Sequence, residues 1–411
     1  MADFKKIYAR YRTFYSSSNL SKTVLYLITG FGTAASFIAR LFIELFAVII
    51  GSSPAIISLI TSSRNLIQQI FQSTFGRISD RIGRRVMLIF GFLFSGLALF
   101  FFPLISKGWV LLIAVIIFSF GYAIYYPAFT ALQGDLTNKD NRAGLISMIT
   151  IVGAIATLSS LLVVGQIGSL GDTTFKQYSI ILRVTALLFI LSACVTLFIF
   201  DPPVKKLQEK TVFSLAPIKK NREFRRFVFI NSIMFFFMSA GWPIFGFVRA
   251  EYATAQENTF IWAAFSIAQI LTLLIVNKII NIIPRKTLLF FGRVFMFYIP
   301  LNLAFTVLWW PYWWVIAIGS AVSGMSNAIF IVGQNSFILD CATTEEKGTY
   351  TGIYNLFLGI SMFFGSLVFG LIAELMFSSL GKWKAITYLL IVITIGRFVS
   401  SLGYLTIRKP K

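Results

Sequence analysis

The sequence predicts an all-α membrane protein of about twelve transmembrane helices, and three observations support this prediction. Of the 411 residues, 57% are hydrophobic and only 12% are charged, about half the charged fraction of an ordinary soluble domain. The charges gather in short segments. The apolar stretches between them are about twenty residues long, the length that a helix needs to cross a hydrocarbon layer of about 30 Å. The basic residues also gather on one side of the predicted membrane.

The first half of the chain contains six such stretches. The first 22 residues are basic and polar and lack the apolar segment and cleavage site of a signal peptide, so we expect a cytoplasmic tail over 1–24. The connection Gly51-Ser-Ser-Pro54 is short and predicts a tight hairpin between the first two spans. The spans of this half are expected at 25–50, 54–75, 86–105, 109–134, 144–168 and 179–200.

Residues 201–226 separate this half from a second set of six spans. The segment begins with Asp201-Pro202-Pro203, which stops a helix, and it holds eight Lys or Arg residues. It is expected to be a cytoplasmic linker between an N-terminal bundle at 25–200 and a C-terminal bundle at 227–406, with a tail at 407–411. The spans of the second half are expected at 227–249, 259–282, 287–308, 312–339, 348–376 and 384–406. Gly241-Trp242-Pro243 is expected to break the seventh span near its outer end.

The basic residues give the predicted orientation. Most of the 36 Lys and Arg residues fall on the side of the two termini. The opposite side is expected to hold only Lys107, Lys176, Arg249, Lys382 and Lys384. This is the positive-inside pattern, so we expect a multi-pass protein of the cell membrane with both termini in the cytoplasm. Basic loops that face anionic lipid explain the net charge of +21 without a nucleic-acid partner.

The two halves resemble each other weakly. Asp135 and Arg142 follow the fourth span, and Asp340 and Lys347 follow the tenth at the same spacing. The alternative is that any cytoplasmic loop collects basic residues, but the shared acidic-to-basic spacing favours duplication. Duplicated six-span halves are typical of transporters that expose a central site to each side of the membrane in turn.

One motif between the second and third spans resembles a known family. Residues 76–85 read Gly-Arg-Ile-Ser-Asp-Arg-Ile-Gly-Arg-Arg. They match the signature G-x-x-x-D-[RK]-x-G-[RK]-[RK] of the major facilitator superfamily at all six specified positions. The resemblance implies two six-helix bundles and secondary transport by alternating access. It also implies a cytoplasmic latch that stabilises the outward-open state. The latch residues would be Gly76, Asp80, Arg81, Gly83, Arg84 and Arg85, with Asp135 and Arg142 as neighbours.

Ionisable residues inside the spans are the strongest candidates for coupling. Arg40 and Glu44 lie four residues apart on one helix face, where they can neutralise each other, and Arg64 lies near the middle of the second span. Such groups are costly in lipid and usually have a function or a partner. Because histidine is absent, Glu44 is the leading proton carrier. Arg40 or Arg64 would bind an anionic group on the substrate or control the pKa of the Glu44 carboxylate. The alternative is a structural salt bridge between the first two spans.

Other polar groups are candidates for a substrate cavity. The resemblance implies that spans 1, 4, 7 and 10 line the cavity, which makes Tyr125, Asn231 and Asn327 candidate contacts. For each residue alone, a hydrogen bond between helices is favoured over a contact with a ligand. Other charged residues, namely Arg183, Arg293, Glu374 and Arg397, are expected nearer the span ends, where long side chains reach the interface.

The remaining expectations concern partners and rival functions. We find no Walker phosphate loop and no metal-ligand cluster, so we expect no enzyme activity, cofactor or metal. The expected partners are a small organic substrate, protons and the lipid bilayer, and the chain is expected to be a monomer. The alternatives are an exporter or flippase for hydrophobic drugs or lipids, a uniporter, and a membrane sensor that transports nothing.

Overall fold

The structure is a computed structural model that describes residues 19–135, 142–199, 216–279, 282–342 and 347–408. These residues are helical, apart from short connections, and none of them forms a β-strand. The first half contains α2 (Asn19–Ile49), α3 (Pro54–Ile70), α4 (Gln72–Ile82), α5 (Arg84–Phe101), α6 (Gly108–Asp135), α7 (Arg142–Gly168) and α8 (Thr174–Thr196). The second half contains α9 (Ala216–Lys220), α10 (Arg222–Ala240), α11 (Trp242–Tyr252), α12 (Ala255–Ile279), α13 (Arg285–Val294), α14 (Tyr298–Leu308), α15 (Trp313–Cys341), α16 (Lys347–Leu380) and α17 (Lys382–Leu402). Three 3-10 turns occur at η1 (Phe102–Leu104), η2 (Phe295–Phe297) and η3 (Gly403–Thr406).

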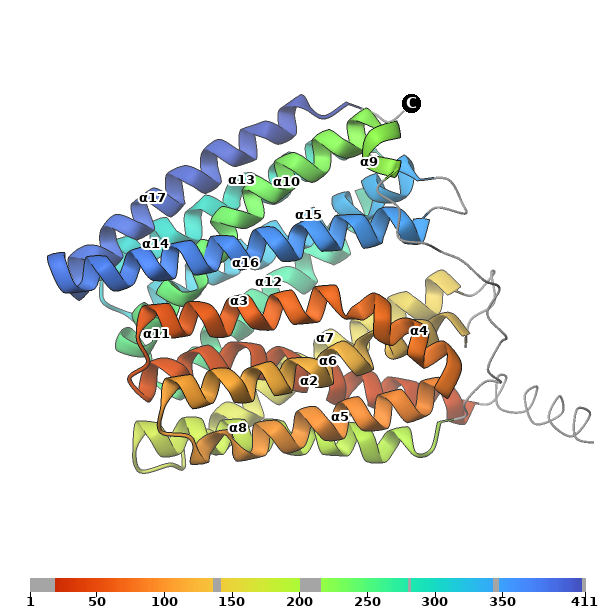
Figure 1. Cartoon of the computed structure of the whole chain (residues 1–411), viewed down its shortest axis with the longest axis horizontal. Helices are drawn as coiled ribbons and strands as arrows, with labels where there is room; N and C mark the ends of the chain where they lie inside the picture. Colours follow the sequence, from red (N-terminus) through yellow and green to blue (C-terminus); the bar gives the residue numbers. More distant parts are fainter. Residues whose placement is uncertain (1–18, 136–141, 200–215, 280–281, 343–346, 409–411) are drawn as a thin grey trace, which may run out of the picture.

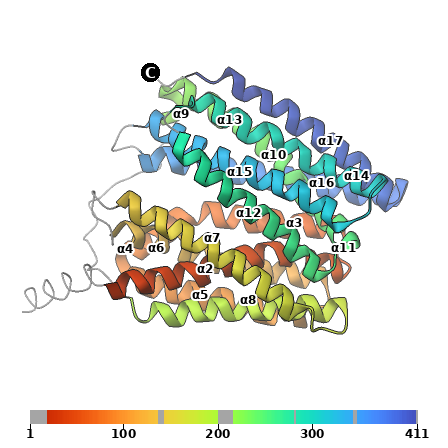
Figure 2. The ribbon, with the colours of Figure 1, turned by 180° about the vertical axis from the view of Figure 1, so that it is seen from behind.

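The helices form an elongated bundle of two halves. Figure 1 shows α2–α8 on one side and α9–α17 on the other, and Figure 2 shows the same division from behind. The start of α2 and the end of α17 lie at one end of the bundle, which we call the terminal end. We call the opposite end, where residues 50–53 connect α2 to α3, the hairpin end.

Eleven segments of the described chain are long and apolar enough to cross a membrane. The one predicted span that is not among them is the second, which corresponds to α3; this helix has 17 residues and carries Arg64. The helix expected over 54–75 is divided at Phe71, where α3 ends and α4 begins. The prediction of twelve membrane helices in two bundles is therefore confirmed, apart from this division. The predicted linker at 201–226 and the two tails lie mostly outside the described residues.

The outer surface of the bundle is largely apolar. On α5, Phe90, Phe94, Leu97 and Phe101 are exposed at helical spacing, and Leu375 of α16 is 71% exposed. A soluble protein rarely exposes so much continuous apolar surface. This arrangement is the one expected of a multi-pass protein that lies in lipid.

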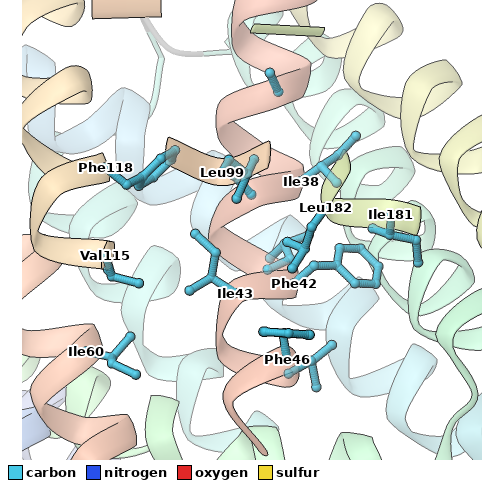
Figure 3. Close-up of a cluster of buried hydrophobic side chains, with 14 of the residues drawn as sticks. Ile38, Phe42, Ile43, Phe46, Ile60, Leu99, Val115, Phe118, Ile181 and Leu182 are labelled. Carbon is cyan, nitrogen blue, oxygen red and sulfur yellow. The ribbon is translucent and has the colours of Figure 1, made fainter. Parts of the chain in front are cut away.

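The centre of the first half is formed by α2. Figure 3 shows Phe42 and Phe46 of α2 directed into a cluster of buried side chains. The same cluster contains Leu99 of α5, Phe118 of α6 and Leu182 of α8. Because lipid tails are as apolar as these side chains, close packing rather than burial from water stabilises such contacts. α2 is therefore packed inside this half, where its main neighbours are α8 and α7.

The connection at residues 50–53 is the predicted tight hairpin. Gly51 has a φ of 74°, a conformation that glycine adopts without steric cost. Ser53 caps α3, since its hydroxyl accepts a hydrogen bond from the Ile56 amide at 3.4 Å. Pro54 follows at the first helical position, where its missing N–H group leaves no hydrogen bond unmade.

The predicted break in the seventh span is also present. α10 ends at Ala240 and α11 begins at Trp242, with Pro243 in its first turn. A proline at this point cannot continue the preceding helix, because it has no N–H group to donate. The break leaves backbone carbonyls of the last turn of α10 without helical partners.

A buried arginine supplies hydrogen bonds to these carbonyls. Arg397 of α17 donates to the carbonyl oxygens of Phe237 at 3.2 Å and Met238 at 2.7 Å, and to that of Met296 in η2 at 3.1 Å. Its side chain is 1% exposed, and that of Arg293 is 2% exposed. Neither arginine therefore reaches the membrane interface, which was expected of only some of the charged residues near the span ends. Arg397 is held inside because two interrupted helices need its donors.

The two halves meet along two pairs of helices, α3 with α16 and α7 with α12. In the first pair, the Ser62 hydroxyl donates to the Phe363 carbonyl at 3.0 Å. At the hairpin end, α11 also packs on α2, and the Ala55 amide donates to Glu374 Oε2 of α16 at 3.1 Å. The halves are therefore joined at the hairpin end by both packing and polar contacts.

Candidate functional site

A cavity of about 430 Å³ lies between α2, α6, α7 and α12. Its lining residues run from Ile28 to Arg40 on α2, from Tyr122 to Gln133 on α6, from Ile149 to Thr157 on α7, and from Ser266 to Ile270 on α12. On α6 and α7 these residues belong to the half of each helix nearer the terminal end. The cavity therefore lies on the terminal side of the contacts that join the two halves at the hairpin end.

Arg40 is the charged residue of this cavity. It is the last cavity-lining residue of α2, and its side chain is exposed. Its guanidinium lies near the Tyr122 hydroxyl and acts electrostatically on Tyr125 and Tyr126. No Asp or Glu is among the residues that line the cavity. The cavity wall therefore carries one net positive charge.

Aromatic rings from α6 surround this charge. Tyr122 stacks on Tyr126 with ring centroids 5.2 Å apart and planes 13° apart. Tyr125 stacks on Phe92 at 4.4 Å and shares a hydrogen bond with the Ser36 hydroxyl. Because residues 122 and 126 lie one helical turn apart, they share a face of α6. The candidate Tyr125 is thus part of the cavity wall, together with its two neighbouring tyrosines.

Glu44 forms an ion pair with Arg64 rather than with Arg40. The Arg64 guanidinium lies 2.7 Å from Glu44 Oε1, and the two side chains are 2% and 14% exposed. Arg64 also donates to the Arg40 carbonyl at 3.3 Å, and the Thr61 hydroxyl donates to Glu44 at 3.4 Å. The neutralisation expected between Arg40 and Glu44 is therefore replaced by a pair between α2 and α3. This leaves the Arg40 guanidinium in the cavity.

A second arginine approaches Glu44 from the other half. The charge of Glu44 acts on Arg249 of α11, and the Arg249 guanidinium lies 4.8 Å above the Trp262 ring. α11 comes close to α2 here because Gly246 has no side chain and faces Val48 and the Glu44 carbonyl. Glu44 therefore pairs with Arg64 of its own half and interacts electrostatically with Arg249 of the other half.

Asn231 and Asn327 do not line this cavity, contrary to expectation. The Asn231 amide donates to the Tyr354 hydroxyl at 2.6 Å and accepts from the Tyr404 hydroxyl at 2.6 Å. Tyr354 in turn donates to Gln334 at 2.7 Å. Asn231 is 1% exposed and joins α10, α16 and η3 within the second half. Its polar group is therefore already satisfied by other helices, which was the alternative interpretation.

The Gly76–Arg85 motif joins three helices at the terminal end. Asp80 forms an ion pair with Arg84, which also donates to the Ser79 hydroxyl at 2.6 Å. Gly83 connects α4 to α5 with a φ of 112°, and Gly76 faces Pro127 of α6. Asp80 therefore pairs within its own half, with another residue of the motif. The side chains of Asp135 and Arg142 lie outside the described residues.

A related ion pair occurs in the second half. Arg285, at the start of α13, lies 3.4 Å from Asp340 near the end of α15. These two residues belong to the segments that echo the first half in the sequence. Each half therefore holds an aspartate–arginine ion pair at the terminal end, although Asp80 and Asp340 do not occupy corresponding positions in the sequence.

Comparison with known proteins identifies the family. The family model described as Major Facilitator Superfamily matches residues 24–366 and 227–411. The chain belongs to this superfamily. As a major facilitator it is a transmembrane transporter, and the recognition based on residues 76–85 is confirmed.

The curated relatives that match in sequence are distant. A multidrug resistance protein, MdtH, of Baumannia cicadellinicola subsp. Homalodisca coagulata is 24% identical over 181 residues, which is 44% of this chain and 42% of that protein. An uncharacterised MFS-type transporter of Methanocaldococcus jannaschii is 25% identical over 127 residues, 31% of this chain and 32% of that protein. The chain thus matches less than half the length of these relatives.

Solved structures of major facilitators share the whole fold. A mutant form of the nucleoside transporter NupG matches with a TM-score of 0.79 at 15% identity, over 95% of this chain and all of that chain. A bacterial homologue of the lysosomal transporter Spinster, in an inward-facing conformation, matches with a TM-score of 0.71 at 14% identity, over 95% and 99%. At these identities the likeness shows the fold alone.

The superfamily resemblance implied a cavity lined by spans 1, 4, 7 and 10. In this major facilitator, the cavity is lined by the first and fourth spans, as expected, but also by the fifth and eighth, α7 and α12. Ser266 and Gln269 of α12 and Thr157 of α7 were therefore missed. The available signal was their polarity within otherwise apolar stretches, with Thr150, Gly153 and Thr157 repeating at helical spacing.

Proposed function

We propose that this chain is a secondary transporter that moves a small organic anion by alternating access and couples this movement to protons. We also propose that it works as a monomer in the cell membrane with both termini in the cytoplasm. The observation that carries the proposal is the position of Arg40, a single cation in a cavity whose lining residues include no carboxylate. The multi-pass fold and the family support the transporter part.

An anion is the substrate that best suits this cavity. A guanidinium cannot lose its charge and presents several N–H donors in a plane, which matches a carboxylate or phosphate. An ionised group within a membrane protein is costly without a partner. The neutral tyrosines provide no counter-charge, so an anionic group of the substrate would stabilise Arg40. A cationic substrate would add a second positive charge to the same space.

Glu44 is the proposed proton carrier because its two arginine partners come from different halves. When the hairpin end is closed, the carboxylate faces Arg64 of α3 and the charge of Arg249 of α11. Opening this end would move Arg249 away from Glu44. The ionised carboxylate would then have less stabilisation, which favours uptake of a proton. Closing it again would favour release. Proton movement would thus accompany the change of conformation.

A specific observation favours one rival function. Phe37, Phe92 and Phe129 line the same cavity as the three tyrosines, and an aromatic cavity accepts hydrophobic compounds. The curated relatives named multidrug resistance protein are consistent with an exporter of such compounds. This function requires that lipophilic cations enter despite Arg40, so the two candidates predict opposite charge preferences.

The test is proton flux in proteoliposomes that contain a pH-sensitive dye. Wild-type protein would be compared with Glu44→Gln, using pools of organic anions, sugars and lipophilic cations. We expect a proton signal that depends on organic anions and disappears in Glu44→Gln. Glu251→Gln is the matched control, because Glu251 is an exposed carboxylate at the same end of the bundle that pairs with Lys382 of its own half at 3.6 Å.

The outcomes separate the candidate functions. A signal with lipophilic cations alone would replace the proposal with the exporter. An anion signal that survives in Glu44→Gln would exclude Glu44 as the carrier. Anion uptake with no proton signal in either protein would indicate a uniporter.

A further inference from the structure

The cavity wall contains hydroxyl groups whose protons already form hydrogen bonds within the protein. Each of these hydroxyls donates to a backbone carbonyl three or four residues earlier in its own helix. They belong to Thr29, Thr33, Thr130, Thr157 and Ser266. Since a hydroxyl has one proton and two acceptor sites, each of these oxygens can only accept a hydrogen bond from an occupant of the cavity. The wall is therefore rich in acceptors.

The charged group of the wall, in contrast, can only donate hydrogen bonds. Arg40 has only donors, and it lies on α2 with Thr29 and Thr33, at the end of the cavity-lining part of that helix. An occupant that satisfies the wall must then combine one anionic group for Arg40 with several hydrogen-bond donors. Those donors must be uncharged, because the lining residues offer no carboxylate to balance an ammonium group.

We infer that the cavity takes a polyhydroxylated monoanion, a molecule of the sugar-acid class. This inference rests on the proposed function and narrows its substrate. The carboxylate binds Arg40, the hydroxyls donate to the threonine and serine oxygens, and the carbon skeleton packs on the rings of Phe92 and Tyr125. The volume of about 430 Å³ lies at the small end of ligand pockets, about 300–1,000 Å³, and suits one small molecule.

Two simpler classes of occupant leave part of the wall unsatisfied. A fatty acid supplies the anion but no donors, so it would displace water from the hydroxyl oxygens and leave them unpaired. A sugar alcohol supplies donors but leaves Arg40 without a counter-charge. A site built for hydrogen bonding rejects analogues that lack the matching groups, so both should bind more weakly than an occupant with both features.

The experiment is calorimetric titration of the full-length protein in detergent with gluconate, hexanoate and sorbitol. These probes have carbon chains of the same length and separate the charge from the hydroxyls. We expect gluconate to bind at least about tenfold more tightly than either of the others. Equal affinity for hexanoate, equal affinity for sorbitol, or binding of no probe by protein that melts cooperatively would each overturn the inference.

Substitutions assign the effect to the cavity. Thr33→Val and Thr157→Val keep the side-chain shape and remove one acceptor each, and they should weaken gluconate binding about three- to tenfold without changing hexanoate binding. Thr185→Val is the matched control, because Thr185 on α8 makes the same kind of bond, to the Ile181 carbonyl at 2.7 Å, away from the cavity. A loss of gluconate affinity in Thr185→Val equal to that in Thr33→Val would contradict the assignment.

Failure of this inference can be told apart from failure of the proposed function. Titration uses no proton gradient, so gluconate binding without proton flux in vesicles would keep the substrate class and reject the coupling. Hexanoate-driven proton flux together with equal affinity for hexanoate and gluconate would keep the anion transporter and reject the sugar-acid class.

Discussion

Glu44 and Arg64 allow a matched pair of substitutions, Glu44→Met and Arg64→Met. Each replaces one member of the ion pair with an unbranched apolar side chain. The two charges lie 2.7 Å apart, and their side chains are 14% and 2% exposed, so water screens the pair little. In each single variant the remaining charge loses its partner, whereas in the double variant neither charge remains.

The expected loss of folding free energy depends on whether the remaining charged group can be neutralised by gaining or losing a proton. Removing one partner of a buried pair costs about 3–5 kcal/mol. In Arg64→Met, Glu44 can take up a proton, which costs an ordinary glutamate about 4 kcal/mol at pH 7 and about 1 kcal/mol at pH 5. In Glu44→Met, Arg64 cannot lose its proton at any accessible pH, and Arg249 loses a counter-charge too. Glu44→Met should therefore be the more destabilising, increasingly so toward pH 5.

The assay is unfolding in mixed detergent micelles between pH 5 and pH 7, with the double variant as reference. The double variant should lie within about 2 kcal/mol of the wild type, because neither member of the ion pair is left without its partner and only the weaker effect on Arg249 is lost. Equal destabilisation by the two single variants at pH 5 would refute the reasoning. Such a result would mean that Arg64 reaches water or another partner when Glu44 is removed.

Three further predictions concern other parts of the fold. Gly83→Ala should destabilise the protein by about 1–2 kcal/mol, because the φ of 112° is unfavourable for a side chain; the melting temperature in detergent measures this. Glu374→Gln should weaken closure of the hairpin end by about 0.3–1 kcal/mol, since an anion at the N-terminus of α3 is lost. Increased labelling of cysteines introduced at that end would show the change. Burial, followed by nearby carboxylates, raises the pKa of Cys341 to about 12, and the reactive species is the thiolate. In a Cys194→Ser background its maleimide labelling should therefore be slow at pH 7 and accelerate about tenfold per pH unit up to pH 9, and a plateau below pH 9 would contradict the raised pKa.

The positions of the helices could be predicted from the sequence because length and polarity determine them. Glycine and proline residues that end or begin helices, such as Gly51, Pro54 and Gly241, predicted the hairpin and the break in the seventh span. The division at Phe71 was missed, since no proline or glycine marks it. The motif at residues 76–85 gave the family because its six specified positions are rarely matched together.

The site was only partly predictable, because the sequence does not determine how each helix is rotated about its axis. In a soluble helix the apolar face indicates the core, but here Phe42 faces the protein interior and Leu375 faces the outside, and both are apolar. Arg40 and Glu44 share a face of α2, yet one enters the cavity and the other pairs with Arg64. The partner from the other half, Arg249, could not be foreseen, since it depends on how α11 docks on α2.

Arg397 has a consequence for the motion of the transporter. Its guanidinium connects α17 to the last turn of α10 and to η2, the two places where helices of the second half are interrupted. Bending at either interruption would separate a positive charge from its acceptors inside the protein, where no water replaces them. The interruptions are therefore poor hinges, and this part of the second half should move as a rigid body. The change between states must then be absorbed where the halves slide on each other, along α3 with α16 and α7 with α12.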